Sequence, residues 1–287
     1  MDQIIFELTE MNIDYKSINI LQEKDGVIVA RINCENKSFV MKLFQRREFR
    51  REIGNYKILS SLNIPTLNFI SSTDKALLIE DVCSNNTYRL GIDKDLDDAE
   101  IATLIAKWYK LLHHRGYEYI EENSCVPLYD ENDLLTFENI EKIKLETNSS
   151  ELPVWKLIEN NFDIIEKLLN KAKRTLTYND FYYTNLIVAQ NRTSAMMFDY
   201  NLLGKGYAYA DIRNVCFSLS EVAKKAFLEE YGKFDISEMI IDNVVSILTT
   251  LHFACQKTLF PSWANYALKE LHTGFIDKVN RLLYLEK

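Results

Sequence analysis

The chain is poor in the residues that interrupt regular structure: among 287 residues there are 8 glycines and 4 prolines. Because these two residues fit a helix interior least well, their scarcity favours long helices with a smaller strand region. Apolar residues make up 47% and charged residues 26%, which excludes intrinsic disorder, a collagen-like repeat and a disulfide-stapled miniprotein. A chain of this length can bury a large core and favours about two domains or lobes.

Cysteine motifs and an excess of basic charge are also missing. The 5 cysteines are scattered and include no CxxC pair, so neither a zinc knuckle nor a dithiol redox motif is expected. Lysine and arginine number 34 against 42 acidic residues, which gives a formal net charge of −8. We therefore expect no nucleic-acid partner, because such partners require a basic face. The acidic balance mildly favours a cationic small molecule.

Long hydrophobic runs are missing as well. The N-terminal residues include acidic side chains and no long apolar core, so we expect no signal peptide there. The most apolar late stretch, residues 239–255, contains Asp242, Asn243 and His252, which makes it too polar for a membrane span. Together with reduced cysteines, these features predict a cytoplasmic protein with no membrane partner.

The first 80 residues predict a small antiparallel sheet with one helix. Runs rich in β-branched and aromatic residues predict strands at residues 27–32, 38–44, 69–70 and 76–80. The second strand contains a single lysine, Lys42, among apolar neighbours. Apolar residues at helical spacing predict a helix over 47–62, with Glu52 at the edge of its buried stripe.

The rest of the chain is predicted to be mostly helical. Helices are expected from Asp97 or Asp98 to His114, closed by Gly116, from Pro153 to Leu169, and near residues 211–231, 236–257 and 262–284. One island interrupts this pattern with short strands at residues 176–178, 185–189 and 195–199, the last two joined by a hairpin turn.

The island contains acidic and amide residues at a distinctive spacing. Asp180 is followed five residues later by Asn185 on a loop before the hairpin, and Asp199 follows the hairpin. Phosphoryl transfer from a nucleotide requires oxygen ligands for Mg²⁺ and an Asp beside the acceptor hydroxyl. It also requires a Lys on the α- and β-phosphates that is held by a Glu, and Lys42 and Glu52 stand upstream in that order.

These residues resemble the aminoglycoside phosphotransferase and choline kinase family, in which Asp-xxxx-Asn precedes an apolar hairpin and a second Asp. Further similarities are the Lys-bearing strand, a hinge at 78–82, a Leu-His helix end at 111–113 and Asp211. The resemblance implies an α+β, two-lobe protein-kinase-like fold. Residues 1–81 would form a small antiparallel-sheet lobe that binds nucleotide phosphates, and residues 82–287 a larger, mainly helical lobe with the catalytic loop.

The resemblance also implies roles for the residues of the island. Asp180 would be the catalytic base that orients the acceptor hydroxyl. Asn185 and Asp199 would bind Mg²⁺. Asp211 would be structural and would brace the catalytic loop.

For the nucleotide, the resemblance implies that Lys42 contacts the α- and β-phosphates and pairs with Glu52. Backbone groups of Glu80, Asp81 and Val82 would hydrogen-bond the adenine. The cofactors would be ATP, or alternatively GTP, and Mg²⁺. The acceptor would be a small-molecule hydroxyl on an aminoglycoside, another sugar or an amino alcohol such as choline. An Ala-Pro-Glu segment is missing, which argues against a protein substrate.

Several positions depart from the family pattern and keep other hypotheses open. Tyr178 replaces the usual His, Asn179 the usual Gly, and Asn201 stands where an acidic residue or Gly is common. Residues 22–26 contain only Gly26 where a glycine-rich phosphate loop is expected. One alternative is a catalytically degenerate kinase-like protein that acts as a nucleotide-binding or partner-binding module. Another is a helical scaffold in which the Asp and Asn spacing is accidental.

Three further features have plain structural interpretations. His113 and His114 are expected to cap a helix, where cations favour the negative end of the dipole. The acidic cluster at 93–98 is expected to be the solvated start of a helix rather than a cation site. Trp263 and Tyr266 either pack the last helix or line the acceptor pocket.

Overall fold

The structure, a computed structural model, describes residues 1–84, 86–123 and 125–286. Within this part of the chain there are two compact units, each assembled from separate segments. The first consists of Met1–Leu112, Tyr178–Leu203 and Asn214–Gly232, and the second of His113–Thr177, Gly204–Arg213 and Lys233–Lys287. The expected division into residues 1–81 and 82–287 stays a prediction.

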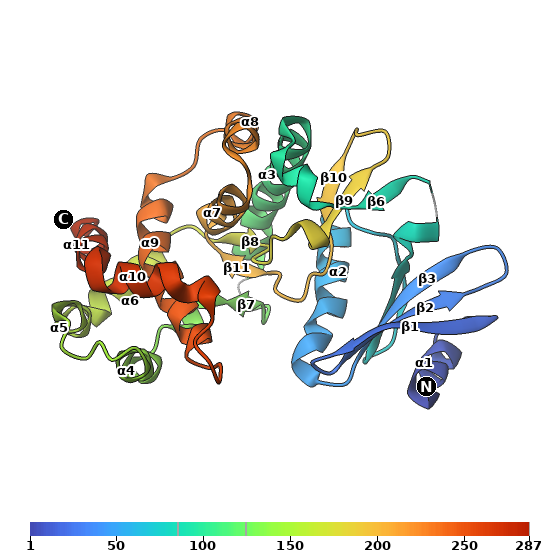
Figure 1. Ribbon diagram of the computed structural model, residues 1–287, viewed down its shortest axis with the longest axis horizontal. Coiled ribbons are helices and arrows are strands. Elements are labelled where there is room, and N and C mark those ends of the chain that lie inside the picture. The colour runs from blue at the N-terminus through green and yellow to red at the C-terminus, as the bar shows by residue number, and fades with distance from the viewer. Residues whose placement is uncertain (85, 124, 287) are drawn as a thin grey trace. The chain divides into compact units, whose positions relative to one another are not determined.

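The first unit contains the expected antiparallel sheet, which has an additional strand at its edge. Over the described residues the strand order is β1-β2-β3-β5-β4. The elements are α1 (Asp2–Glu10), β1 (Ser17–Lys24), β2 (Val27–Asn33), β3 (Ser38–Phe44), α2 (Arg51–Ser61), β4 (Phe69–Ser72) and β5 (Ala76–Glu80). Figure 1 shows β1, β2 and β3 side by side, with α1 at the N-terminus close to them. The sequence does not predict β1, because its largely exposed residues lack a clear apolar alternation.

The two faces of this sheet differ because side chains alternate along each strand. Ile28 of β2 and Met41 of β3 are buried in one hydrophobic cluster with Leu8 of α1. Lys42 and its cross-strand partner Val29 therefore lie on the opposite face. The helix α1 thus covers one face of the sheet and leaves the other face for the site that contains Lys42.

The remaining elements are short strands and helices. The strands β6 (Tyr88–Leu90), β9 (Leu186–Ala189) and β10 (Ala195–Met197) form a sheet in the order β10-β9-β6, and β7 (Tyr129–Asp130), β8 (Thr175–Thr177) and β11 (Gly204–Gly206) form one in the order β7-β11-β8. The helices are α3 (Ala99–Glu122), α4 (Phe137–Glu146), α5 (Pro153–Asn160), α6 (Phe162–Lys171), α7 (Ala208–Ser218), α8 (Glu221–Tyr231), α9 (Ile236–Ala254), α10 (Asn265–Thr273) and α11 (Phe275–Tyr284). The expected α+β class is confirmed.

Two expected helix ends are wrong. The helix α3 continues through Gly116 to Glu122. A Cβ atom at Gly116 would lie 2.5 Å from Thr175 Oγ1, so glycine here allows β8 to pass close to the helix rather than ending it. The helix expected from Pro153 to Leu169 is interrupted at Asn161, whose φ of −126° separates α5 from α6.

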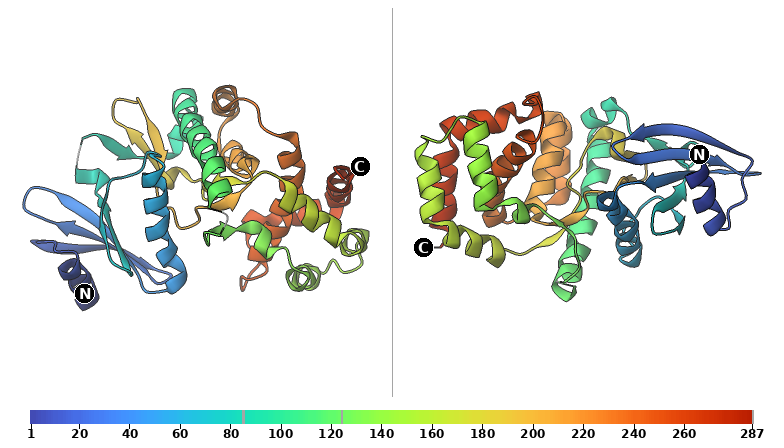
Figure 2. Two further views of the ribbon diagram at one scale, coloured as in Figure 1. Left: turned by 180° about the vertical axis from the view of Figure 1, so that it is seen from behind. Right: turned by 90° about the horizontal axis from the view of Figure 1, so that it is seen from below.

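The helix α9 lies at the centre of the second unit. Its apolar residues share one buried cluster with residues of α4, α5, α6, α10 and α11, and Figure 2 shows the green and red helices of this unit gathered near the C-terminus. By length and composition this helix could cross a membrane, contrary to the expectation from its polar residues. More than half of its most apolar 18-residue stretch is buried, and its buried Asp242 pairs with Arg213 at 2.6 Å. This pattern is that of a core helix.

Candidate active site

Lys42 shares its ammonium group with two carboxylates. Lys42 Nζ lies 2.8 Å from Glu52 Oε1 on α2 and 3.0 Å from Asp199 Oδ1, just after β10. The side chains of Lys42 and Glu52 are 8% and 2% exposed, whereas that of Asp199 is 38% exposed. Burial lowers the pKa of Lys42, but the two carboxylates raise it by more, so the pKa lies above its ordinary value. Lys42 is therefore a charged group held at a fixed position.

The helix α2 fixes both the lysine and the backbone that follows Asp199. Glu52 Oε1 accepts hydrogen bonds from Lys42 Nζ and from the Tyr200 N–H, at 2.8 and 3.3 Å. Asn55, three residues further on the same helix, donates through Nδ2 to the Tyr200 C=O at 2.7 Å. Burial raises the pKa of Glu52; Lys42 opposes this and Asp199 adds to it, so the pKa stays raised.

The hairpin of β9 and β10 brings Asn185 and Asp199 to neighbouring strand ends. Its last paired residues are Leu186 and Met197. One step beyond, the Phe198 N–H donates to the Asn185 C=O at 3.0 Å. Asp199 stands fourteen positions after Asn185 in the sequence, and the antiparallel pairing brings the two close together.

Asp180 is coupled to this hairpin through Asn185. Asn185 Nδ2 donates to the Asp180 backbone C=O at 3.1 Å and to its Oδ2 at 3.0 Å. Burial raises the pKa of Asp180 to about 6, and the nearby charge of Asp199 contributes to this increase. The structure therefore brings Asp180, Asn185, Asp199, Lys42 and Glu52 together, all of them within the first unit.

Two departures from the family pattern are accommodated by the loop. Tyr178 is completely buried, and its hydroxyl donates to the Phe198 C=O at 2.5 Å. Its ring packs edge-to-face against Trp108, with ring centroids 5.9 Å apart. Asn179 has a φ of +65°, the left-handed conformation that glycine adopts easily, and its Nδ2 donates to the Leu202 C=O at 3.0 Å. Both residues support the loop that carries Asp180.

Part of the backbone of residues 80–82, the segment expected to bind adenine, already forms hydrogen bonds within the protein. The Glu80 N–H donates to the Asn68 C=O at 3.0 Å, and the Asp81 C=O accepts from the Ser84 N–H at 3.0 Å. The Asp81 side chain is buried and pairs with Arg31 Nε at 2.6 Å. Asp81 therefore fastens the end of β5 to β2, and of the three expected residues Val82 takes part in none of these contacts.

A cavity of about 220 Å³ lies beside Lys42. Its lining comes from β1, β2, β3 and α2 and includes Lys42, Glu52, Asp199 and Asn201. The turn between β1 and β2 is the two-residue loop Asp25-Gly26, whose φ angles are +52° and +83°.

Asn185 and Asp199 supply the hard oxygen atoms that Mg²⁺ prefers. Because Asn185 Nδ2 donates to Asp180, its Oδ1 is the atom available as a ligand. In the part of the chain that the structure describes, no group of three or more His, Cys, Asp or Glu side chains is arranged for a metal ion. Mg²⁺ is commonly held by one or two protein oxygens together with substrate phosphates, and these two residues fit that mode.

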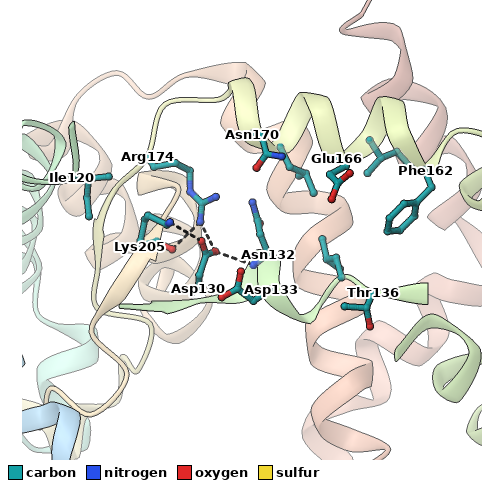
Figure 3. A pocket seen from close by; sticks show the side chains of 13 residues that line it. Ile120, Asp130, Asn132, Asp133, Thr136, Phe162, Glu166, Asn170, Arg174 and Lys205 are labelled. Atoms are coloured by element: carbon teal, nitrogen blue, oxygen red, sulfur yellow. Dashed lines mark hydrogen bonds and ion pairs between the residues drawn. The ribbon is translucent and has the colours of Figure 1, made fainter. Parts of the chain in front are cut away.

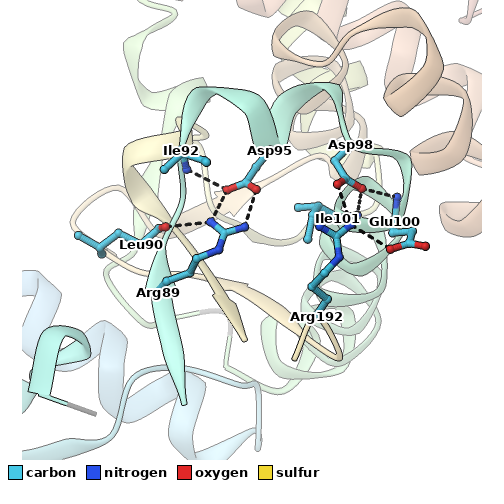
Figure 4. Close-up of polar contacts among 8 residues, drawn as sticks. All are labelled: Arg89, Leu90, Ile92, Asp95, Asp98, Glu100, Ile101 and Arg192. Carbon is cyan, nitrogen blue, oxygen red and sulfur yellow. Dashed lines mark hydrogen bonds and ion pairs between the residues drawn. The ribbon is translucent and has the colours of Figure 1, made fainter. Parts of the chain in front are cut away.

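The acidic segment at 93–98 supports the same hairpin. Asp95 is buried and binds Arg89 of β6 through two hydrogen bonds of 2.6 and 2.7 Å (Figure 4). Asp98 Oδ1 accepts from the Ile101 N–H at 3.2 Å, so the expected cap of α3 is present. Asp98 Oδ2 accepts from Arg192, in the β9–β10 turn, at 2.6 Å. The carboxylates of Asp95 and Asp98 therefore form ion pairs with Arg89 and Arg192, and the expected solvated helix start is wrong.

A larger cavity, of about 460 Å³, is lined by residues of the second unit. Figure 3 shows Asp130 at one side of it, paired with Arg174 at 2.5 Å and Lys205 at 3.3 Å. In the same unit, His113 Nε2 lies 3.0 Å from Asp211 Oδ2, and both side chains are buried. His113 is thus a buried polar contact within α3, and the expected helix cap is wrong because α3 continues to Glu122.

Sequence analysis missed some residues that build the site. Asn55 lies three residues after Glu52 and therefore on the same face of α2, a spacing that could have identified it. No sequence pattern identifies Arg89 and Arg192, because only the tertiary fold brings them to their partners Asp95 and Asp98.

No protein-family model matches the chain, and no curated protein sequence matches it. Among solved structures, the chain is similar to choline kinase LicA from Streptococcus pneumoniae, with 12% identity, a TM-score of 0.60 and 98% of each chain covered. It is also similar to a macrolide 2′-phosphotransferase from Brachybacterium faecium, with 12% identity, a TM-score of 0.59, and 96% of this chain and 99% of that chain covered.

A third similar structure is the AMP-bound complex of spectinomycin phosphotransferase, with 15% identity, a TM-score of 0.60, and 97% of this chain and 98% of that chain covered. At these identities the likeness shows the fold. The chain has the kinase-like fold of small-molecule phosphotransferases over nearly its whole length, as the resemblance in sequence implies.

Proposed function

We propose that this protein is a phosphotransferase that uses ATP and Mg²⁺ to phosphorylate a hydroxyl group of a small molecule. The observation that carries the proposal is the convergence of the Glu52 and Asp199 carboxylates on the Lys42 ammonium group, at 2.8 and 3.0 Å, beside a cavity. Asp180 and Asn185 lie on the adjoining loop and are hydrogen-bonded to each other. A buried lysine with two carboxylates could be merely structural, but Asp180 and Asn185 would then have no reason to adjoin it.

In this proposal each residue acts through its position and charge. Lys42 binds the α- and β-phosphates, and Glu52 holds its ammonium group in place. Asn185 and Asp199 hold Mg²⁺, which neutralises the phosphate oxygens when it is bound. Asp180 accepts the proton of the acceptor hydroxyl, and its raised pKa of about 6 places it close to the neutral range, where a general base works best.

The remaining features of the proposal concern partners and location. The acceptor is a hydroxyl-bearing small molecule such as an aminoglycoside, another sugar or an amino alcohol. The named actions of the similar structures on macrolide, choline and spectinomycin support this class. The similar structures with ADP or AMP bound support the use of an adenine nucleotide, which the proposal places at the segment 80–82. Four cysteines with free thiols, Cys34, Cys83, Cys216 and Cys255, support a cytoplasmic location.

The proposal is tested by nucleotide binding and turnover. We expect ATP with Mg²⁺ to raise the melting temperature, and a screen of aminoglycosides, sugars and amino alcohols to reveal an acceptor that consumes ATP. Asp199→Ala should raise the Mg²⁺ concentration needed for half-maximal turnover by about tenfold, because one carboxylate ligand is lost. An unchanged Mg²⁺ dependence would contradict the role of Asp199. If the protein neither binds nor turns over ATP, it is a degenerate kinase-like module.

A further inference from the structure

The cavity beside Lys42 holds an excess of negative charge. Three carboxylates line it, from Asp25, Glu52 and Asp199, but only two ammonium groups, from Lys24 and Lys42. Lys42 is already shared by Glu52 and Asp199. A triphosphate with one Mg²⁺ would bring further negative charge into this space. A second cation that can turn toward the phosphates would therefore strengthen their binding.

Lys24 faces the cavity because of the strand register. The two-residue turn Asp25-Gly26 pairs Lys24 with Val27, and Gln22 pairs with Val29. Val29 in turn pairs with Lys42 on β3. Directly opposed residues of antiparallel strands place their side chains on the same face, so Lys24 and Gln22 share the face of Lys42.

An irregularity in β1 separates this polar pair from the apolar half of the strand. Ile18 pairs with Ile32, which is buried against α1 on the other face of the sheet. Ile18, Gln22 and Lys24 are all even-numbered, so a regular strand would place them on one face. The register shifts between Ile20 and Gln22, so the even-numbered side chains after the shift lie on the opposite face of the sheet from Ile18. β-Bulges of this kind re-aim side chains and are common next to active sites.

The same turn explains why a side chain is needed here. Kinase-like sites commonly cover the phosphates with backbone N–H groups of a glycine-rich loop. Here the hairpin is closed by Asp25 and Gly26 alone, and a Cβ at Gly26 would lie 2.7 Å from Arg46 Cγ. The turn is therefore packed against Arg46, and Gly26 is the one glycine it contains.

We propose that Lys24 is a second phosphate-binding residue, which contributes from β1 the charge that a glycine-rich loop cannot supply in this protein. The proposal rests on the proposed nucleotide-dependent function. The Lys24 side chain is 70% exposed, and its contact with the Asp25 carboxylate is a weak one of 3.9 Å. It is free to exchange that contact for phosphate oxygens at little cost to the fold.

The test is calorimetric binding of ATP, ADP, AMP and adenosine, with Mg²⁺ present, to the wild type and to Lys24→Met. We expect the Kd for ATP to rise about tenfold, the size of one lost charge-assisted contact, and the Kd for adenosine to stay unchanged. Lys24→Arg should restore ATP affinity. Glu23→Gln is the matched control, because Glu23 pairs with Ile28 on the opposite face, and it should bind ATP no more weakly than the wild type.

Wild-type affinity for ATP in Lys24→Met would overturn the assignment of Lys24 while leaving the proposed function intact. An equal loss of affinity for all four ligands would also overturn it, because it would show a structural effect on the site. A wild-type protein that binds none of the nucleotides would refute the proposed function itself. Melting temperatures of all the variants, measured without ligand, confirm that each is folded.

Discussion

Asp180→Asn is expected to abolish transfer and at the same time to stabilise the fold. The carboxyl of Asp180 has an ordinary pKa of 3.8 and a folded-state pKa of about 6, raised by burial and by Asp199. Folding therefore favours the protonated form. The stabilising contribution of this group is complete below pH 3.8, falls as the pH rises through about 6, and is absent above that pH.

The magnitude follows from the size of the shift. A difference of about 2 pKa units corresponds to a cost of about 3 kcal/mol for keeping the carboxylate ionised in the folded protein at neutral pH. Asp180 is only partly buried, and solvent screening reduces this to about 2 kcal/mol. Asparagine has nearly the same shape, still accepts the hydrogen bond from Asn185 and carries no charge. The variant should gain about 2 kcal/mol, or about 4 °C in melting temperature.

The assay is urea unfolding of the wild type and Asp180→Asn at about pH 7.5 and about pH 4.5. The stabilisation should be present at the higher pH and largely lost at the lower one, where the wild-type carboxyl is protonated. Asp242→Asn serves as a control of opposite sign, since it removes the partner of Arg213 and should destabilise the protein. An Asp180→Asn variant that is equally stabilised at both pH values, or destabilised at the higher one, would refute the reasoning.

Two other substitutions test local backbone requirements in the same unfolding assay. Asn179→Ala should cost about 1 kcal/mol because alanine disfavours the φ of +65°, whereas Asn179→Gly should be tolerated better; equal losses would show that the side-chain contact with Leu202 dominates instead. Gly116→Ala should cost about 1–3 kcal/mol, because its Cβ would lie 2.6 Å from the Leu176 backbone nitrogen; a neutral result would mean that β8 is not held as closely against α3 as described.

The sequence was sufficient for the parts of the site that depend on local patterns. Lys42 stands alone among apolar residues in a strand, and the spacing from Asp180 to Asn185 and Asp199 reflects a loop and a short hairpin. These patterns are local because strand alternation and turn chemistry act over a few residues. The helix ends depend on the tertiary structure as well: Gly116, expected to close a helix, lies within α3 where β8 passes close.

By itself, the amino-acid sequence determined the α+β class and identified Lys42, Glu52 and Asp199, three of the charged residues that meet beside the cavity. Only the tertiary structure decided how they meet. It decided that Asn55 holds the backbone after Asp199, that Arg31 engages Asp81, and that the register shift in β1 places Lys24 on the face of Lys42. Such contacts join residues far apart in the chain or depend on strand register, and no local propensity encodes either of them.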